Sequence, residues 1–281
     1  MVVTQPDRPR GRGRKLTSPP IKVLADELGL PVLQPESMKR VEHVERLSAL
    51  APDLLVVVAW GQILTRDMLD LPRVGAVNLH PSLLPKYRGP APIHWAVING
   101  EDETGVTTIF LDEGVDTGPI LMSRRIPIGA LETTGRLHDR LAVAGAELLL
   151  ETIAGLKNGT VRARPQPETG AGSAPMLKKS DGRIDWTRSA DRLAALVRGL
   201  DPQPGAYSTF RGQSCKLFGG RAGPGRGRPG QVLALDDGCL HVAAGQGSLG
   251  VARLQLAGKK PVPAEAFWHG QHLSGQDCFI T

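Results

Sequence analysis

Cysteine is scarce in this sequence. The 281 residues include only Cys215, Cys239 and Cys278, which are odd in number and widely spaced. This spacing excludes a disulfide framework and a paired-cysteine metal site, and it favours a reducing compartment. The expected location is therefore the cytoplasm.

Aromatic residues and long apolar runs are also lacking. Phe, Trp and Tyr make up only 4% of the chain, which argues against an aromatic membrane belt and against a platform that stacks nucleic-acid bases. No apolar run approaches the length of a membrane span, and no secretory leader is seen at the start, so we expect no membrane partner. The remaining composition, 41% hydrophobic and 22% charged, is usual for a soluble globular protein. The length allows one large domain or two modest ones.

Acidic residues are missing from two basic segments. The first lies in a loop expected over residues 5–16 and carries Arg8, Arg10, Arg12, Arg14 and Lys15. The second lies within residues 202–235 and carries Arg211, Lys216, Arg221, Arg226 and Arg228. Two acid-free basic segments suggest a polyanionic partner, although solvated loops in a chain that favours arginine are an alternative interpretation.

Strand and helix patterns alternate up to about residue 160. Residues 54–60 form a continuous apolar run, which is typical of a strand covered on both faces in a parallel sheet. Further strands are predicted over 75–80 and 105–112, and a long helix is predicted over about 134–157. A shorter helix is expected to start at Ser18-Pro19. This alternation predicts an open α/β domain.

The composition changes after residue 165. Residues 165–175 contain three prolines and two glycines and have no periodicity, which is typical of a linker. A short helix is expected near 189–200, followed by short strand-like runs at regular intervals that predict a small β-barrel. We therefore expect an α/β domain over residues 1–165, a linker over 166–180 and a barrel domain over 181–281.

Polar side chains stand at the end of the strand predicted over 75–80. Asn78 and His80 end this strand, and a turn bracketed by Pro81 and Pro85 follows. Asp116 lies in a Gly-flanked turn after the next predicted strand. Because ligands of open α/β sheets bind beyond the carboxyl ends of the strands, these side chains are candidates for a common site.

This combination suits a transfer reaction that passes through a tetrahedral intermediate. An Asn amide donates to a developing oxyanion, a His exchanges a proton near neutral pH, and a carboxylate orients the His. The competing interpretation, that all three are ordinary hydrogen-bonded turn residues, stays open on the residues alone.

Three ordered elements resemble the folate-dependent formyltransferases. They are Asn78-x-His80, the turn Ser82-Leu83-Leu84-Pro85, and Asp116-Thr117-Gly118. The resemblance implies a Rossmann-like formyltransferase sheet in which Asn78, His80 and Asp116 are catalytic. It also implies that Ser82, Leu83, Leu84 and Pro85 lie against the folate cosubstrate, 10-formyltetrahydrofolate, and that no metal takes part.

Further segments resemble the branch of that family that formylates methionyl-tRNA. These are residues 4–16, 178–186, 198–207 and 258–260. The resemblance implies that the first basic segment contacts the acceptor arm of initiator methionyl-tRNA, and that the C-terminal domain is an OB-like barrel touching tRNA. A monomer is expected. A formyltransferase for glycinamide ribonucleotide or an amino-sugar nucleotide, and a tRNA-binding relative without catalysis, are the alternatives.

The sequence departs from the family pattern at two places. Leu200 and Gln203 stand where the family usually has aromatic residues. Members of the family also begin with a strand, a turn and a helix ahead of the segment that corresponds to Val3, and loss of that strand would expose the edges of its neighbours. We therefore expect a misassigned start in preference to a shortened, impaired relative.

Overall fold

The computed structural model describes residues 1–10, 13, 15–38, 40–62 and 64–280. The chain divides into two compact units. One consists of Met1–Leu79 with Ile109–Gly118, and the other of His80–Thr108 with Pro119–Thr281.

Short parallel strands and helices make up the first unit. Strand β1 (Val2–Val3) pairs in parallel with β4 (Val32–Leu33), and helix α1 (Pro20–Glu27) lies between them in sequence. Helix α1 begins at Pro20, where no amide hydrogen is needed, one residue later than the start expected from Ser18-Pro19, and Pro19 occupies its N-cap. Strand β5 (Leu54–Val57) also pairs in parallel with the start of β6 (Gly75–His80). Helices α2 (Val41–Ser48) and α3 (Arg66–Leu69) belong to the same part of the chain.

The first basic segment forms a hairpin, where a loop was expected. Strand β2 (Arg8–Arg10) pairs antiparallel with β3 (Lys15–Thr17), with Arg8 opposite Thr17 and Arg10 opposite Lys15. Asp7 anchors the base of the hairpin, accepting hydrogen bonds from Gln34 (2.7 Å) and Ser18 (3.0 Å) and pairing with Lys22 (3.2 Å). The hydrogen bond from Gln34, followed by those from Ser18 and Lys22, lowers the pKa of Asp7 in spite of its partial desolvation.

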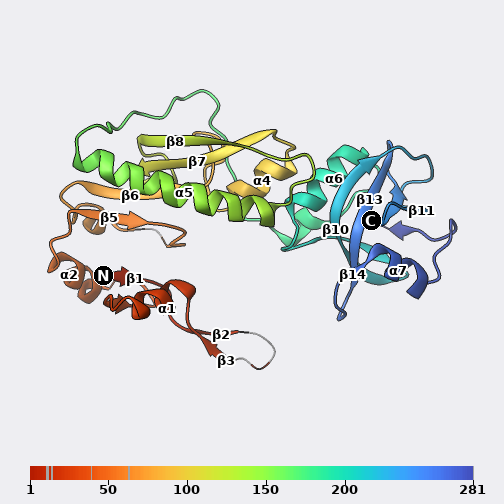
Figure 1. Cartoon of the computed structure of the whole chain (residues 1–281), viewed down its shortest axis with the longest axis horizontal. Helices are drawn as coiled ribbons and strands as arrows, with labels where there is room; N and C mark the ends of the chain where they lie inside the picture. The colour runs from red at the N-terminus through yellow and green to blue at the C-terminus, as the bar shows by residue number, and fades with distance from the viewer. Residues whose placement is uncertain (11–12, 14, 39, 63, 281) are drawn as a thin grey trace. The chain divides into compact units, whose positions relative to one another are not determined.

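Strands β5, β6, β7 (Glu103–Phe110) and β8 (Ile120–Pro127) are neighbours in that order in a four-stranded sheet. Helix α4 (Pro92–Ile98) precedes β7 in sequence. Helix α5 (Thr134–Lys157) packs on β8, and Figure 1 shows it running along that strand. The Thr133 side chain caps its start by accepting a hydrogen bond from the Arg136 amide, and Asn158-Gly159 ends it as predicted.

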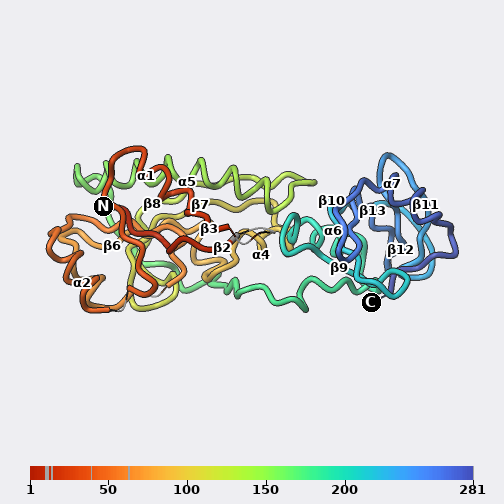
Figure 2. Tube along the Cα trace, turned by 90° about the horizontal axis from the view of Figure 1, so that it is seen from below, coloured from red at the N-terminus to blue at the C-terminus, as the bar shows by residue number. Residues whose placement is uncertain are grey.

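The last hundred residues or so form an all-β domain with two helices, shown in blue in Figure 2. The hydrogen-bonded strand order is β11-β12-β13-β10-β9-β15, with β14 on β13. Trp186, Phe210 and Phe279 fill its core, their rings 4.9–5.8 Å apart. The elements are α6 (Ala190–Gly199), β9 (Ala206–Phe210), β10 (Gln213–Gly223), β11 (Val232–Asp236), β12 (Cys239–Ala243), β13 (Ser248–Leu256), β14 (Val262–Pro263), α7 (Ala264–Gly270) and β15 (Phe279–Ile280). The predicted α/β fold followed by an all-β domain is confirmed. No helix in the described part of the chain is long and apolar enough to cross a membrane.

Candidate active site

Strand β6 carries two of the predicted site residues. Asn78 is the fourth residue of Gly75–His80 and His80 is the last. Because side chains alternate along a strand, residues two positions apart point to the same side of it. Asn78 is half-buried and His80 is only 3% exposed, so the imidazole is shielded from bulk water.

The third predicted residue, Asp116, contacts Asn78. The Asn78 Nδ2 atom donates a hydrogen bond of 3.4 Å to Asp116 Oδ1. Asp116 adopts a left-handed backbone conformation, with φ of 53°, which Asp tolerates better than most residues. The structure thus joins the end of β6 to the turn after β7, as the motif spacing indicated. A contact between His80 and Asp116 stays a prediction.

The turn that carries Asp116 is held by its own side chains. Asp112 Oδ1 accepts hydrogen bonds from the Gly114 amide (3.0 Å) and the Thr117 hydroxyl (2.8 Å). At Gly118 there is no room for a side chain, since a Cβ atom would lie 1.8 Å from the carbonyl oxygen of Phe110. The conformation that presents Asp116 therefore depends on Asp112 and on glycine at position 118.

A backbone carbonyl determines the protonation pattern of His80. The Nε2 atom of His80 lies 2.9 Å from the carbonyl oxygen of Tyr87. Because a carbonyl oxygen only accepts hydrogen bonds, Nε2 carries the hydrogen, and the neutral ring has its lone pair at Nδ1. In this tautomer Nδ1 is the ring nitrogen that carries no hydrogen.

The turn after His80 is rigid. The Ser82 hydroxyl donates to the carbonyl oxygen of Lys86 (2.7 Å), and the Thr107 hydroxyl donates to that of Ser82 (2.7 Å). Ser82, Leu84 and Pro85 are buried and Leu83 is half-buried. A Cβ atom at Gly105 would lie 2.5 Å from the Leu83 side chain, so β7 packs closely on this turn. The predicted contact of residues 82–85 with folate is not tested by this packing and stays a prediction.

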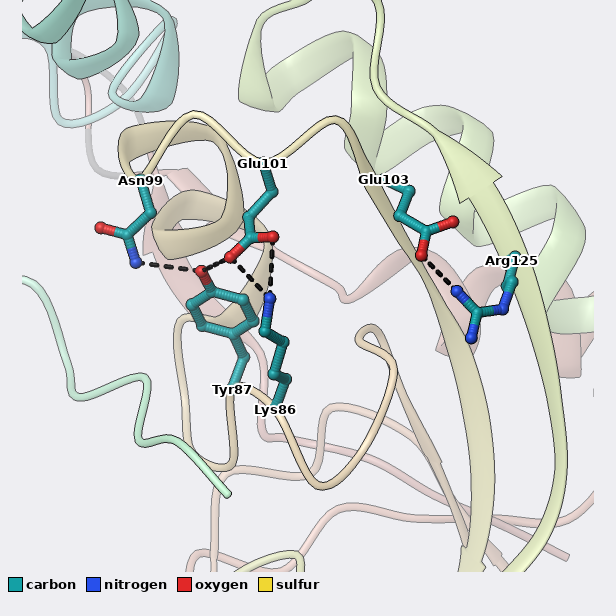
Figure 3. Close-up of polar contacts among 6 residues, drawn as sticks. All are labelled: Lys86, Tyr87, Asn99, Glu101, Glu103 and Arg125. Atoms are coloured by element: carbon teal, nitrogen blue, oxygen red, sulfur yellow. Dashed lines mark hydrogen bonds and ion pairs between the residues drawn. The ribbon is translucent and has the colours of Figure 1, made fainter. Parts of the chain in front are cut away.

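Sequence patterns did not indicate the polar network beyond this turn, which Figure 3 shows. The Tyr87 hydroxyl donates to Glu101 Oε1 (2.7 Å) and accepts from Asn99 Nδ2 (3.0 Å). Lys86 Nζ bonds both carboxylate oxygens of Glu101 at 2.9 Å. In the sequence, this network is marked only by a clustering of polar residues after Pro85 and after α4. Such clustering is common in surface loops and does not indicate a particular network.

Models of known families match both parts of the chain. The formyl transferase family matches residues 1–153, and the formyl transferase C-terminal domain matches residues 176–272. The chain belongs to the formyl transferase family. A protein named methionyl-tRNA formyltransferase from Desulfotalea psychrophila is 51% identical over 282 residues, covering 100% of this chain and 87% of that protein. One of the same name from Citrifermentans bemidjiense is 49% identical over 272 residues, covering 97% of this chain and 86% of that protein.

Solved structures of other proteins share the fold. HypX from Aquifex aeolicus in complex with tetrahydrofolic acid is 24% identical, with a TM-score of 0.64 over 83% of this chain and 42% of that one. An N-formyltransferase from Helicobacter canadensis, in complex with folinic acid and dTDP-3-aminofucose, is 16% identical, with a TM-score of 0.65 over 88% and 86% of the two chains. At these sequence identities the similarity extends only to the fold.

Two of the five predicted tRNA-contacting residues can be described fully. Arg8 and Lys15 lie exposed on the hairpin strands β2 and β3. Arg10 ends β2, and Arg12 and Arg14 lie outside the described residues. Two cations on an exposed hairpin are suited to contacts with phosphate groups, but such contacts stay a prediction.

Within the residues that the structure describes, no three or more His, Cys, Asp or Glu side chains gather closely enough to hold a metal ion.

Proposed function

We propose that this chain transfers the formyl group of 10-formyltetrahydrofolate to the amino group of methionine on initiator methionyl-tRNA, and so supports translation initiation. The proposal rests on sequence identities of 49% and 51% to relatives named methionyl-tRNA formyltransferase. This similarity extends through the C-terminal domain. The solved sugar N-formyltransferase from Helicobacter canadensis shares only 16%. We place the reaction in the cytoplasm and expect a monomer.

The proposed reaction needs an oxyanion donor and a group that handles protons. The methionine amine attacks the formyl carbon, the carbonyl oxygen becomes an oxyanion, and the bond from that carbon to N10 of the folate then breaks. One proton leaves the amine and one arrives at N10, so the transfer is balanced. In this proposal Asn78 Nδ2 donates to the oxyanion, which is worth about 2.7–4 kcal/mol in comparable sites.

His80 and Asp116 handle the protons in this proposal. With its hydrogen held on Nε2 by Tyr87, His80 uses Nδ1 to exchange a proton with the tetrahedral species. Asp116, which accepts the Asn78 hydrogen bond, keeps the amide nitrogen rather than the amide oxygen directed at the reacting group, and it helps to relay the amine proton.

Substrate binding is assigned to the turn after His80 and to the basic hairpin. The buried turn Ser82–Pro85, with its half-buried Leu83, offers apolar surface and fixed backbone groups to the pterin of the donor. The end of the segment 57–61 is also proposed to contact the pterin. Arg8, Arg10, Arg12, Arg14 and Lys15 are proposed to contact the acceptor arm of the tRNA.

The proposal is tested by formylation of charged initiator tRNA with 10-formyltetrahydrofolate. Glycinamide ribonucleotide and a dTDP-linked amino sugar are offered as competing amines under the same conditions. Formyl transfer to methionyl-tRNA that falls sharply in Asn78→Ala supports the proposal. Transfer only to another amine, or tRNA binding by a folded chain without any transfer, would overturn it.

A further inference from the structure

Tyr87 is held in a strained backbone conformation. Its φ of 64° lies in the left-handed region, which is unfavourable for a bulky residue, and its side chain is only 9% exposed. Such conformations persist where the surrounding contacts determine them, and they gather at functional sites. The carbonyl oxygen of this strained residue is the one that accepts the hydrogen bond from His80 Nε2.

Two hydrogen bonds hold the hydroxyl of Tyr87 in place. Its hydroxyl donates to Glu101 and accepts from Asn99, while Lys86 neutralises Glu101 (Figure 3). Burial raises the pKa of Tyr87 to about 12, so the phenol remains a donor at neutral pH. Burial also acts to raise the pKa of Glu101, but the hydrogen bonds from Lys86 and Tyr87 outweigh it and lower that pKa. The acceptor therefore stays charged.

Backbone contacts hold both neighbours of Tyr87. The carbonyl oxygen of Lys86 accepts from the Ser82 hydroxyl. On the other side, the Arg88 amide donates to the carbonyl oxygen of Gly172 (2.8 Å), and the Ala174 amide donates to that of Arg88 (2.6 Å). The Tyr87 carbonyl and the Arg88 amide share one planar peptide group, so the bond to Gly172 and the fixed tyrosine ring together constrain the direction of that carbonyl.

We propose that Tyr87 is a positioning residue for His80: its phenol, bound by Glu101 and Asn99, orients the strained carbonyl that keeps the hydrogen on His80 Nε2. The proton-handling lone pair is thereby kept at Nδ1. The consequence for catalysis rests on the proposed function, in which His80 exchanges a proton with the tetrahedral species. The proposed effect of Tyr87 on the tautomer of His80 does not depend on the proposed function.

The first experiment observes His80 without substrates. In protein labelled with ¹⁵N at histidine, NMR detects the Nε2–H of His80, assigned by its loss in His80→Gln. We expect a slowly exchanging Nε2–H in the unmodified protein. In Tyr87→Phe, which keeps the ring but removes the hydroxyl, we expect faster exchange with solvent and a ring averaged between its two tautomers.

Variants of the carboxylates provide the matched comparison. Glu101→Gln retains an oxygen that accepts from the phenol and should have a mild effect, whereas Glu101→Ala should resemble Tyr87→Phe. Glu103→Gln is the control, because Glu103 pairs with Arg125 at the surface, close to the network but apart from it (Figure 3). This control should leave the Nε2–H unchanged.

Steady-state kinetics then measure the effect of these substitutions on formyl transfer. A misplaced general acid or base lowers kcat by about ten- to a hundredfold, with little change in KM for either substrate. An Nε2–H that exchanges equally slowly in the unmodified protein, Tyr87→Phe and Glu101→Ala overturns the proposal. If Tyr87→Phe does not fold, the two Glu101 variants decide the matter. If the unmodified chain transfers no formyl group, the proposed function fails, while the NMR comparison still tests the positioning role.

Discussion

Asn78 and Asp116, 38 residues apart in the sequence, are joined by a hydrogen bond of 3.4 Å from Nδ2 to Oδ1. A carboxylate accepts hydrogen bonds and repels a carbonyl oxygen, so this contact also fixes which side of the Asn78 amide faces Asp116. The amide is therefore oriented before any substrate arrives, as electrostatic stabilisation of a transition state requires.

The first prediction concerns the loss of this amide. Asn78→Ala should lower kcat about 10²- to 10³-fold in formyl transfer to methionyl-tRNA, because one oxyanion donor is removed. Asn78→Asp should be at least as damaging, since it places two carboxylates side by side and raises the pKa of one of them. Asn158→Ala, at the exposed end of α5, serves as the control. An Asn78→Ala protein with unchanged kcat would remove Asn78 from the mechanism.

The second prediction concerns the turn that presents Asp116. In Gly118→Ala the new Cβ atom would collide with the carbonyl oxygen of Phe110, so the turn must shift. We expect a loss of about 1–3 kcal/mol in the free energy of unfolding, as for other overpacked sites, together with a lower kcat. Gly270→Ala is the control, since a Cβ atom there has no neighbour within 4 Å among the described residues. Urea unfolding of both variants measures the difference.

The third prediction concerns stability at alkaline pH. The pKa of Tyr87 is raised by burial from 10.0 to about 12 in the folded protein, so the folded state holds this proton more tightly than the unfolded state. The resulting stabilisation is fully present below about pH 10 and is lost as the pH rises through about 12. Tyr87→Phe should lack this component. The test compares the pH dependence of the unfolding free energy in the two proteins between these values, and parallel curves would contradict it.

The fourth prediction concerns the basic hairpin. If Arg8 and Lys15 each contact a phosphate, Arg8→Ala and Lys15→Ala should each reduce the slope of log affinity for tRNA against log salt by about 0.7–0.9. Lys157→Ala, an exposed cation at the end of α5, should leave the slope unchanged. Binding titrations at several salt concentrations measure these slopes, and equal slopes in all four proteins would exclude the hairpin from the contact.

Regular elements with strong local signals were predicted well. The strand at 75–80 and the helix at 134–157 have the bounds that were expected, because a continuous apolar run or a helical period ends at a clear polar or glycine signal. The strand expected over 54–60 ends at Val57, since Ala59 turns into a left-handed conformation with φ of 47°. Helix α4 and strand β8 were not anticipated; β8 contains two consecutive arginines that obscure its alternation.

Contacts within the candidate site could be predicted only where two side chains make them. The contact between Asn78 and Asp116 follows from the rule that parallel strands present their carboxyl ends at one edge. The bond from His80 to Tyr87 uses a backbone carbonyl, whose direction is set by a left-handed φ and by a glutamate 14 residues away. No local pattern encodes that direction, so it emerges only from the folded chain.

Ser173 forms a parallel bridge with Arg88, and the Gly172 amide donates to the carbonyl oxygen of Pro85. The segment that was expected to link two domains is thus paired with the turn that follows His80. In recombination between relatives, a crossover at residue 165 would bring in a foreign partner for that turn together with the foreign C-terminal domain. A crossover after Pro175 would keep the native pair intact, so chimaeras joined at these two points should differ in activity even when both fold.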